Sequence, residues 1–238
     1  MINLVALVLG LVLFSWLHDQ AGTNVASATA NARVVQSVER FLHLNCEVVA
    51  NHWLAGHPAL MLAAALYYRL YYLPVAGVLL WVLVRRPDLY PKIRSTLAVM
   101  AALALLVFWF VPVSPPRFAL PGIIDVVAKY DILDIRGSHA LVSGHGQLSA
   151  MPSLHLGWSA LGAYAAWCSL RGTHRRLAPL VWSFPLVMIM VVITTGAHYI
   201  LDLVGSMVLL VTSLTAATVW NRWRSHNRFQ NQSHSGHS

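Results

Sequence analysis

The sequence predicts an all-α integral membrane protein that folds as a six-transmembrane-helix bundle, and two observations predict this class. Hydrophobic residues make up 58% of the 238 residues and charged residues only 10%, whereas soluble domains usually carry about 25% charged residues. Six apolar segments also approach the length that crosses about 30 Å of hydrocarbon, which is roughly 20 residues of helix. The composition therefore excludes an ordinary soluble domain.

The predicted spans cover residues 2–17, 58–84, 95–113, 153–170, 177–195 and 198–220. The first span is short, and a secretory signal is its alternative, because Ala26-Ser27-Ala28 resembles a cleavage site. No basic residue precedes the apolar run, which favours a retained helix. We expect residues 1–224 to form one membrane domain. Residues 225–238 are rich in Ser, Asn, Gln and His and are expected to form a disordered cytoplasmic tail.

The formal net charge of +8 comes from basic residues that gather between the spans, not in a single nucleic-acid-binding patch. Most of them lie in three segments that share one side of a six-span topology: Arg85, Arg86, Lys92 and Arg94, then Arg171, Arg175 and Arg176, and finally Arg222, Arg224 and Arg228. Cytoplasmic loops carry such an excess of Lys and Arg. We therefore expect a plasma-membrane protein with both termini in the cytoplasm, contacts with membrane lipids and no nucleic-acid partner.

Residues 33–50 lie in the polar segment that follows the first span. Apolar and charged residues alternate in this stretch, with Val34, Val38 and Phe41 beside Glu39 and Glu47. This pattern predicts an amphipathic helix that lies at the outer membrane interface. An ordered loop is the alternative.

His198 and Asp202 are four residues apart, and a helix places such a pair on one face. Asp202 can accept a hydrogen bond from one imidazole nitrogen of His198, which fixes the tautomer and directs the other nitrogen outward. A pair that only stabilises the helix is the alternative. A carboxylate inside a membrane helix is costly, so we interpret the pair as functional.

Pro152-Ser153-Leu154-His155 begins the fourth predicted span. Proline is favoured in a first helical turn, and the unpaired N–H groups of that turn form an anion site together with the helix dipole. The Ser153 hydroxyl can add a donor, and His155 is close enough to protonate a leaving oxygen. An interfacial histidine with a capping serine is the alternative.

Two arginines complete the candidate set. Arg117 lies at the outer end of the third span, and its guanidinium suits phosphate because it binds oxygens bidentately and stays charged. Arg69 lies inside the second span, where an arginine needs a partner or a polar cavity. Arg69 either lines the same pocket or belongs, with the tyrosines around it, to an interfacial aromatic belt.

An even number of spans brings both histidine motifs to the same membrane depth. Spans four and six then both enter the membrane from the outer face. We therefore expect an outer-face active site in which the imidazoles of His155 and His198 face each other across a gap about the size of one phosphate.

At these motifs the chain resembles the type-2 phosphatidic acid phosphatase superfamily of membrane enzymes, which has six spans, a Pro-Ser-X-His motif and a later His-X-X-X-Asp motif. The resemblance covers about residues 58–215, the expected phosphatase-like core. It implies that His198 is the nucleophile that takes the phosphoryl group, that Asp202 orients it and that His155 is the general acid. It also implies a reaction that needs no metal ion and no cofactor.

The chain departs from the family pattern at the phosphate-binding positions. The family's first motif has a Lys six residues before Arg-Pro, but Pro116 precedes Arg117 here and Phe110 occupies the lysine position. Val192 stands where the family has an arginine before the last histidine. The chain therefore looks more like the branch that contains inositol phosphorylceramide synthase and its bacterial relatives.

Together these features predict a lipid phosphate phosphatase that cleaves a phosphomonoester or pyrophosphate of a lipid through a phosphohistidine intermediate. One alternative is a lipid phosphotransferase of the inositol phosphorylceramide synthase type, and another is a transporter or proton relay. Two histidines and a carboxylate can also form a metal site, although we expect none. Cys46 and Cys168 fall on opposite sides of the predicted topology, so we expect neither a disulfide nor a metal cluster from them.

Overall fold

The computed structural model describes residues 2–21, 23–130 and 148–235, and these residues are organised almost entirely as helices. The helices are α1 (Ile2–Gln20), α2 (Val25–Phe41), α3 (Glu47–Ala55), α4 (Pro58–Leu70), α5 (Tyr72–Arg85), α6 (Tyr90–Phe110), α7 (Pro116–Ala119), α8 (Val126–Lys129), α10 (Leu154–Leu170), the 3₁₀ helix η1 (Ala178–Trp182), α11 (Ser183–Thr194) and α12 (Ile200–Ser235). Among the described residues extended pairing is limited to an isolated parallel bridge between Val113 and Ser149. The predicted all-α class is therefore confirmed.

Three helical segments of the described residues are long and apolar enough to cross a membrane. They are Pro58–Arg85, Tyr90–Phe110 and Ile200–Arg224. The apolar segment Ala178–Thr194 is shorter, and α10 has 17 residues. These findings support a membrane protein, and the number of six spans stays a prediction.

The predicted second span, 58–84, is divided into α4 and α5 by a turn at Tyr71. Pro74 follows three residues later, and its missing N–H removes the helical hydrogen bond to the Leu70 carbonyl. At 1.5 Å per residue, the 28 residues of Pro58–Arg85 extend over about 42 Å, which is more than the hydrocarbon core of about 30 Å. The break divides this segment into α4, which packs on α11, and α5, which packs on α10.

The predicted amphipathic helix over 33–50 is two helices, α2 and α3. His43 adopts a φ of 57° between them, and a residue in this left-handed conformation ends a helix. The prediction of one continuous helix is therefore wrong, because the backbone at His43 ends α2 and a new helix begins at Glu47.

The tail expected to be disordered from residue 225 also differs from the structure, since α12 continues to Ser235. A helix that already exists can add residues without a new nucleus, because nucleation is the costly step in helix formation.

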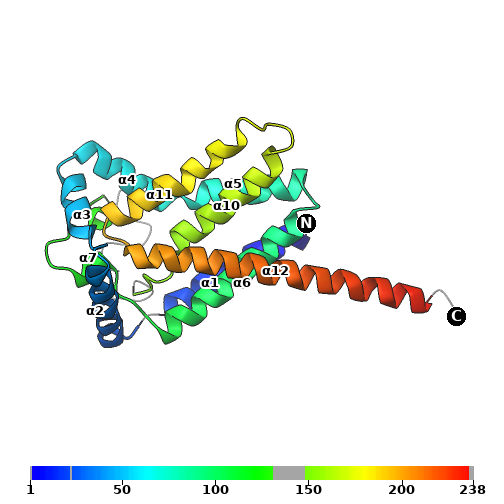
Figure 1. Ribbon diagram of the computed structural model, residues 1–238, viewed down its shortest axis with the longest axis horizontal. Helices are drawn as coiled ribbons and strands as arrows, with labels where there is room; N and C mark the ends of the chain where they lie inside the picture. Colours follow the sequence, from blue (N-terminus) through cyan, green and yellow to red (C-terminus); the bar gives the residue numbers. More distant parts are fainter. Residues whose placement is uncertain (1, 22, 131–147, 236–238) are drawn as a thin grey trace.

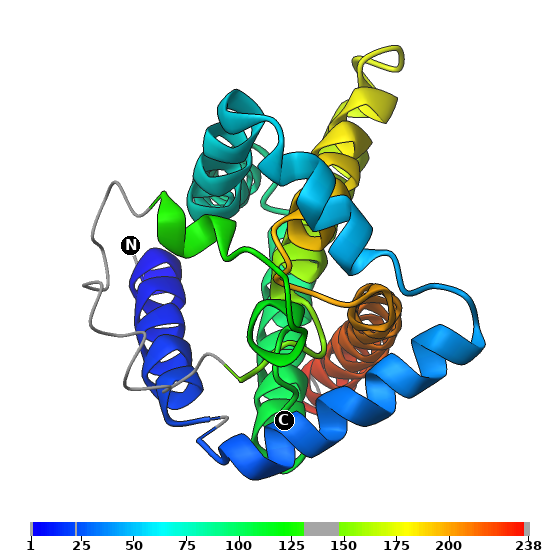
Figure 2. The same ribbon diagram turned by 90° about the vertical axis from the view of Figure 1, so that its left-hand side faces the viewer.

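The long helices run along one axis, and α2 crosses the end of the bundle (Figure 1). α10 packs against α5, α6, α11 and α12, while α12 packs on α6 and α1 packs on α6. When this end is turned toward the viewer, α2 and α3 lie across it, and α7 lies beside them near its centre (Figure 2). The chain segments that lead into α10 and α12 meet at this end, where the Ser153 N–H donates to the Asp202 carbonyl.

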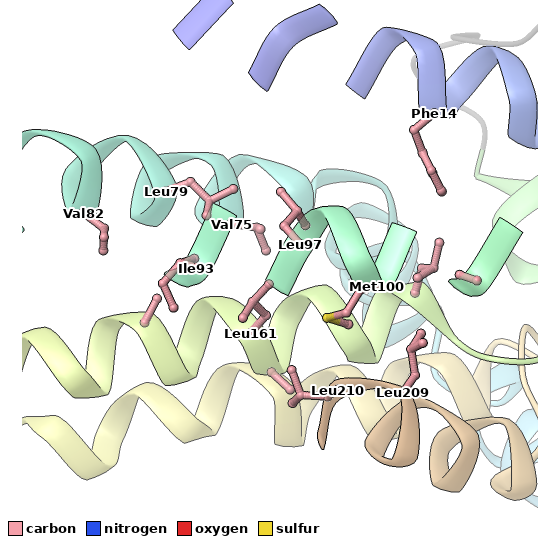
Figure 3. Close-up of a cluster of buried hydrophobic side chains, with 14 of the residues drawn as sticks. Phe14, Val75, Leu79, Val82, Ile93, Leu97, Met100, Leu161, Leu209 and Leu210 are labelled. Atoms are coloured by element: carbon pink, nitrogen blue, oxygen red, sulfur yellow. The ribbon is translucent and has the colours of Figure 1, made fainter. Parts of the chain in front are cut away.

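α10 is the central helix, and its buried residues lie on all sides of it. A helix that is apolar all round belongs in an interior. In the main core, shown in Figure 3, Leu161 of α10 lies among Val75 of α5, Met100 of α6 and Leu210 of α12. Phe14 of α1 joins the same cluster, so α1 is packed as part of the bundle.

Candidate active site

His198 is buried immediately before α12, and two acceptors hold its Nδ1 atom. Nδ1 lies 2.8 Å from the Ala150 carbonyl oxygen and 3.3 Å from Asp202 Oδ2. A carbonyl oxygen can only accept, so Nδ1 carries the proton. In the neutral ring Nε2 therefore has the lone pair that a nucleophile needs.

Asp202 is fully buried in the first turn of α12. Its Oδ2 atom also accepts a 2.8 Å hydrogen bond from the Tyr199 backbone N–H. Asp202 thus caps the start of its own helix and binds His198 at the same time. The predicted contact between His198 and Asp202 is present, although His198 lies before the helix and not on it.

His155 in the first turn of α10 lies directly against His198. Its Nδ1 atom is 3.4 Å from His198 Nε2. The two rings face each other as expected, but at the limit of hydrogen-bond distance and not across a phosphate-sized gap. Because Nε2 has a single lone pair in the ring plane, a phosphorus atom must take the place of this contact.

Two tyrosines hold the His155 ring. Tyr68 stacks on it with ring centroids 4.1 Å apart and an interplanar angle of 22°. Tyr71, in the turn between α4 and α5, lies 4.6 Å away at 43°. The α4–α5 break thus brings two aromatic rings to the level of the histidines.

Ser153 is buried and caps α10, where its side-chain oxygen accepts a 3.4 Å hydrogen bond from the Leu156 N–H. Its backbone N–H donates to the Asp202 carbonyl at 3.3 Å, and the Ser206 hydroxyl lies 2.8 Å from the Ser153 carbonyl oxygen. These bonds tie the first turn of α10 to the first turn of α12. The hydroxyl hydrogen of Ser153 can still be donated to a ligand.

Arg117 lies on α7 and carries an unused donor. Its Nε atom is 3.6 Å from Asp125 Oδ2, while its buried Nη1 atom has no hydrogen-bond partner among the described residues. A buried donor of this kind is costly unless a partner arrives, which suits an oxyanion ligand.

The two imidazoles, the buried carboxylate and the buried guanidinium donor are the kinds of groups that attack on phosphorus needs. A family model described as the PAP2 superfamily matches residues 33–216, most of the chain. The chain belongs to the PAP2 superfamily. Members of this superfamily are typically phosphatases or phosphotransferases, so the chain has a phosphatase-type phosphoryl-transfer function. Searches among curated proteins and among solved structures found no match.

The superfamily predicted from the two histidine motifs is thereby confirmed, and the inositol phosphorylceramide synthase-like branch stays a prediction. Both motifs lie inside the region that matches the PAP2 superfamily, whereas α1 precedes it. Among the described residues no group of three or more His, Cys, Asp and Glu side chains is arranged to hold a metal ion.

Arg69 of this PAP2 protein has a structural contact outside the histidine pair. Its Nη2 atom donates a 3.0 Å hydrogen bond to the Val127 carbonyl, which holds α8 against α4. α8 begins after Asp125, whose Oδ1 atom accepts from the Ala128 N–H and whose Oδ2 atom faces Arg117. Arg69 therefore supports the segment that positions Arg117, and its own contact with phosphate stays a prediction.

Sequence reasoning missed Gly196 and Ala150. Gly196 has a φ of +67°, and a Cβ atom there would lie 2.6 Å from Ile123 Cγ2. Its carbonyl accepts the Arg117 N–H at 2.8 Å, so it joins the Arg117 segment to the His198 loop. A glycine two residues before the histidine was a usable signal, whereas the Ala150 carbonyl leaves no mark in the sequence.

Asn51 was missed as well. This fully buried side chain donates to the carbonyls of Ile124 and Thr194, each at 3.0 Å. Its oxygen accepts the Ile124 N–H at 2.8 Å. Asn51 thus fastens α3 to the segment after α7 and to the end of α11, next to the His198 loop.

Proposed function

We propose that this protein is an integral membrane lipid phosphate phosphatase that cleaves a phosphomonoester or pyrophosphate of a lipid through a phosphohistidine intermediate. One observation carries the proposal. The Nδ1 atom of His198 is held by the Ala150 carbonyl and Asp202, so that Nε2 carries a lone pair beside His155. This is the arrangement of an oriented nucleophile next to a proton donor.

In the first step, His198 Nε2 attacks phosphorus and the bond to the leaving oxygen breaks. His155 gives a proton to that oxygen, so the leaving group departs as an alcohol or a phosphate. Asp202 stabilises the positive charge that forms on the His198 ring. The unpartnered Nη1 of Arg117 and the amides at the start of α10 are the candidate donors to the phosphoryl oxygens.

In the second step, water attacks the phosphorus and the bond to His198 breaks. His155, now neutral, takes the proton from the water. Inorganic phosphate leaves, and both histidines return to their starting protonation states. The proton count therefore balances over one turnover with no cofactor.

We place the site on the extracytoplasmic side of a plasma membrane, with six spans in one domain over residues 1–224 and both termini in the cytoplasm. The charge distribution supports this orientation. Arg85 ends α5 and Arg171 follows α10, so both lie at the end of the bundle away from the histidines. Basic residues prefer the cytoplasmic side, which leaves α2, α3 and α7 at the outer interface.

A lipid phosphotransferase of the inositol phosphorylceramide synthase type is the second candidate. Val192 is buried and occupies the position of the family's later arginine, which favours this branch. His198 would then carry the phosphoryl group together with its headgroup after the first lipid alcohol leaves, and a second lipid alcohol would replace water in the second step.

A phosphate-release assay on purified protein separates these functions. The panel contains phosphatidic acid, phosphatidylglycerol phosphate and polyprenyl phosphates and pyrophosphates, with His198→Ala as the control. Hydrolysis releases inorganic phosphate in water alone, whereas a transferase yields product only after a lipid alcohol is added. Absence of phosphate release and of transfer across the panel would refute the proposed function. Activity that disappears with a chelator and returns with a metal ion would refute the metal-independent mechanism.

A further inference from the structure

Glu39 is a buried carboxyl group outside the histidine site. It lies on the inner face of α2 with a relative exposure of 1%. Its Oε1 atom accepts a 2.8 Å hydrogen bond from the Leu201 backbone N–H. Leu201 is in the first turn of α12 next to Asp202, so a helix that crosses the end of the bundle contacts the turn that carries the His198 partner.

A second carboxyl group faces the first. Glu47, at the start of α3, is 2% exposed, and its side chain acts on the ionisation of Glu39. Its Oε1 atom has no partner among the described residues. Two carboxyl groups can share a hydrogen bond only when one of them is protonated, so a bond between Glu39 and Glu47 requires one proton.

The surroundings of Glu39 favour that proton. The titratable groups that act on it are Glu47 and Cys46 beside α3, and Asp202 and Tyr199 at the start of α12. All of these are neutral or negative. Burial, followed by the hydrogen bond and the charge of Glu47 and the charge of Asp202, raises the pKa of Glu39 to about 8, although the hydrogen bond from the Leu201 N–H acts in the opposite direction. α7 also packs on α2, but its Arg117 is paired with Asp125.

We propose that Glu39 is a positioning residue for the active site, and that it holds the first turn of α12 in place through a proton shared with Glu47. This inference rests on the proposed function. While the proton is present, the Leu201 contact keeps Asp202 at its distance from His198. When the proton is lost, two negative groups face each other in a buried place beside Asp202. Their repulsion outweighs the stronger bond from the Leu201 N–H, so α2 moves away from the turn.

Two substitutions test this role. Glu39→Gln keeps an oxygen for the Leu201 N–H and an N–H donor for Glu47 but cannot titrate. Glu39→Ala removes the contact. We expect Glu39→Gln to keep activity near that of the unmodified protein at pH 7 and to lose less activity above pH 8. We expect Glu39→Ala to lower kcat about tenfold with little change in KM, as loss of one such hydrogen bond implies.

A stability measurement tests the shared proton without any activity. Because the pKa of Glu39 rises from 4.5 to about 8 on folding, the folded protein binds this proton more tightly than the unfolded chain. The unfolding temperature in detergent should therefore fall as pH rises from about 4.5 to about 8. Glu39→Gln should flatten this fall. Asp88→Asn, which changes an exposed carboxylate paired with Arg86, should leave the fall unchanged.

The outcomes separate this inference from the proposed function. In one outcome, no lipid phosphate is cleaved but Glu39→Gln flattens the pH dependence of unfolding. The shared proton is then supported, whereas the proposed function and the positioning role of Glu39 are both refuted. If phosphate is released and Glu39→Gln unfolds with the same pH dependence as the unmodified protein, the shared proton is refuted. An unchanged kcat in a folded Glu39→Ala protein refutes the positioning role. If Glu39→Ala does not fold, the Glu39→Gln profiles still decide.

Discussion

Replacing Gly196 with alanine tests how the His198 loop is joined to the Arg117 segment. The new Cβ atom would lie 2.6 Å from Ile123 Cγ2 and 3.5 Å from Arg117 Cβ. The φ of +67° is a left-handed conformation that costs an L residue about 1–2 kcal/mol. The neighbouring side chains must also move to make room for the new Cβ atom, which costs a further ~1–3 kcal/mol in a packed region. We therefore expect Gly196→Ala to lower the free energy of unfolding by about 2–5 kcal/mol.

The same change should affect catalysis. The Gly196 carbonyl accepts the Arg117 N–H, so displacement of Ile123 and of this loop also moves Arg117. A misplacement of about 1 Å in a reacting geometry can cost about 10²-fold in rate. We expect kcat/KM for phosphate release to fall between about tenfold and about a hundredfold.

Gly77→Ala is the matched control. Gly77 lies within α5, and a Cβ atom there would meet nothing within 4 Å. Alanine is favoured over glycine in a helix by about 1 kcal/mol, so this variant should unfold at the same temperature or slightly higher and keep full activity. Thermal unfolding in detergent and phosphate release are measured on both variants. A Gly196→Ala protein that matches Gly77→Ala in both assays would refute the reasoning.

Three further predictions concern the histidine site. Asp202→Asn should lower kcat by about 10–100-fold, because the Ala150 carbonyl still holds His198 Nδ1. This loss is less than the roughly 10⁴-fold expected when a carboxylate alone fixes the tautomer. A loss of about 10⁴-fold would contradict this role of Ala150. Arg117→Lys keeps the charge but loses the fork of donors, so KM should rise about tenfold and Arg117→Ala should raise it further; an unchanged KM in both variants would remove Arg117 from the phosphate site. His155→Ala should leave a trace of activity, since acid–base help contributes about 10²–10⁴-fold, and the unmodified protein should show a bell-shaped pH profile. A flat profile between about pH 5 and 8 would contradict the assignment of base and acid to the two histidines.

Much of the site could be predicted because its parts are local in the sequence. The four-residue spacing of His198 and Asp202 brings the pair together at the start of a helix, and the proline before Ser153 indicates the start of α10. The membrane character follows from composition alone. These features depend on neighbouring residues and on the bilayer thickness, so they can be inferred without the path of the rest of the chain.

Other parts could not be predicted because they depend on contacts between distant segments. The Ala150 carbonyl is 48 positions from His198, and a backbone group has no sequence signature. The Glu39 contact spans 162 positions and requires α2 to cross the end of the bundle. The turn at Tyr71 has a local cause in Pro74. Its effect is that Tyr68 and Tyr71 contact the His155 ring, and this could not be predicted because the contact depends on how the turn lies against α10.

By itself the sequence determined the kind of protein and the reacting groups: a helical membrane protein with an imidazole–carboxylate pair and a second imidazole at a helix start. Hydrophobic composition and helical periodicity are enough for this, since both act over a few turns. Only the tertiary structure decided which nitrogen of His198 is unprotonated, how close His155 lies, and which residues hold α12 in place. The reason is physical: hydrogen bonds act over about 3 Å, and packing alone brings residues that are far apart in the chain within that distance.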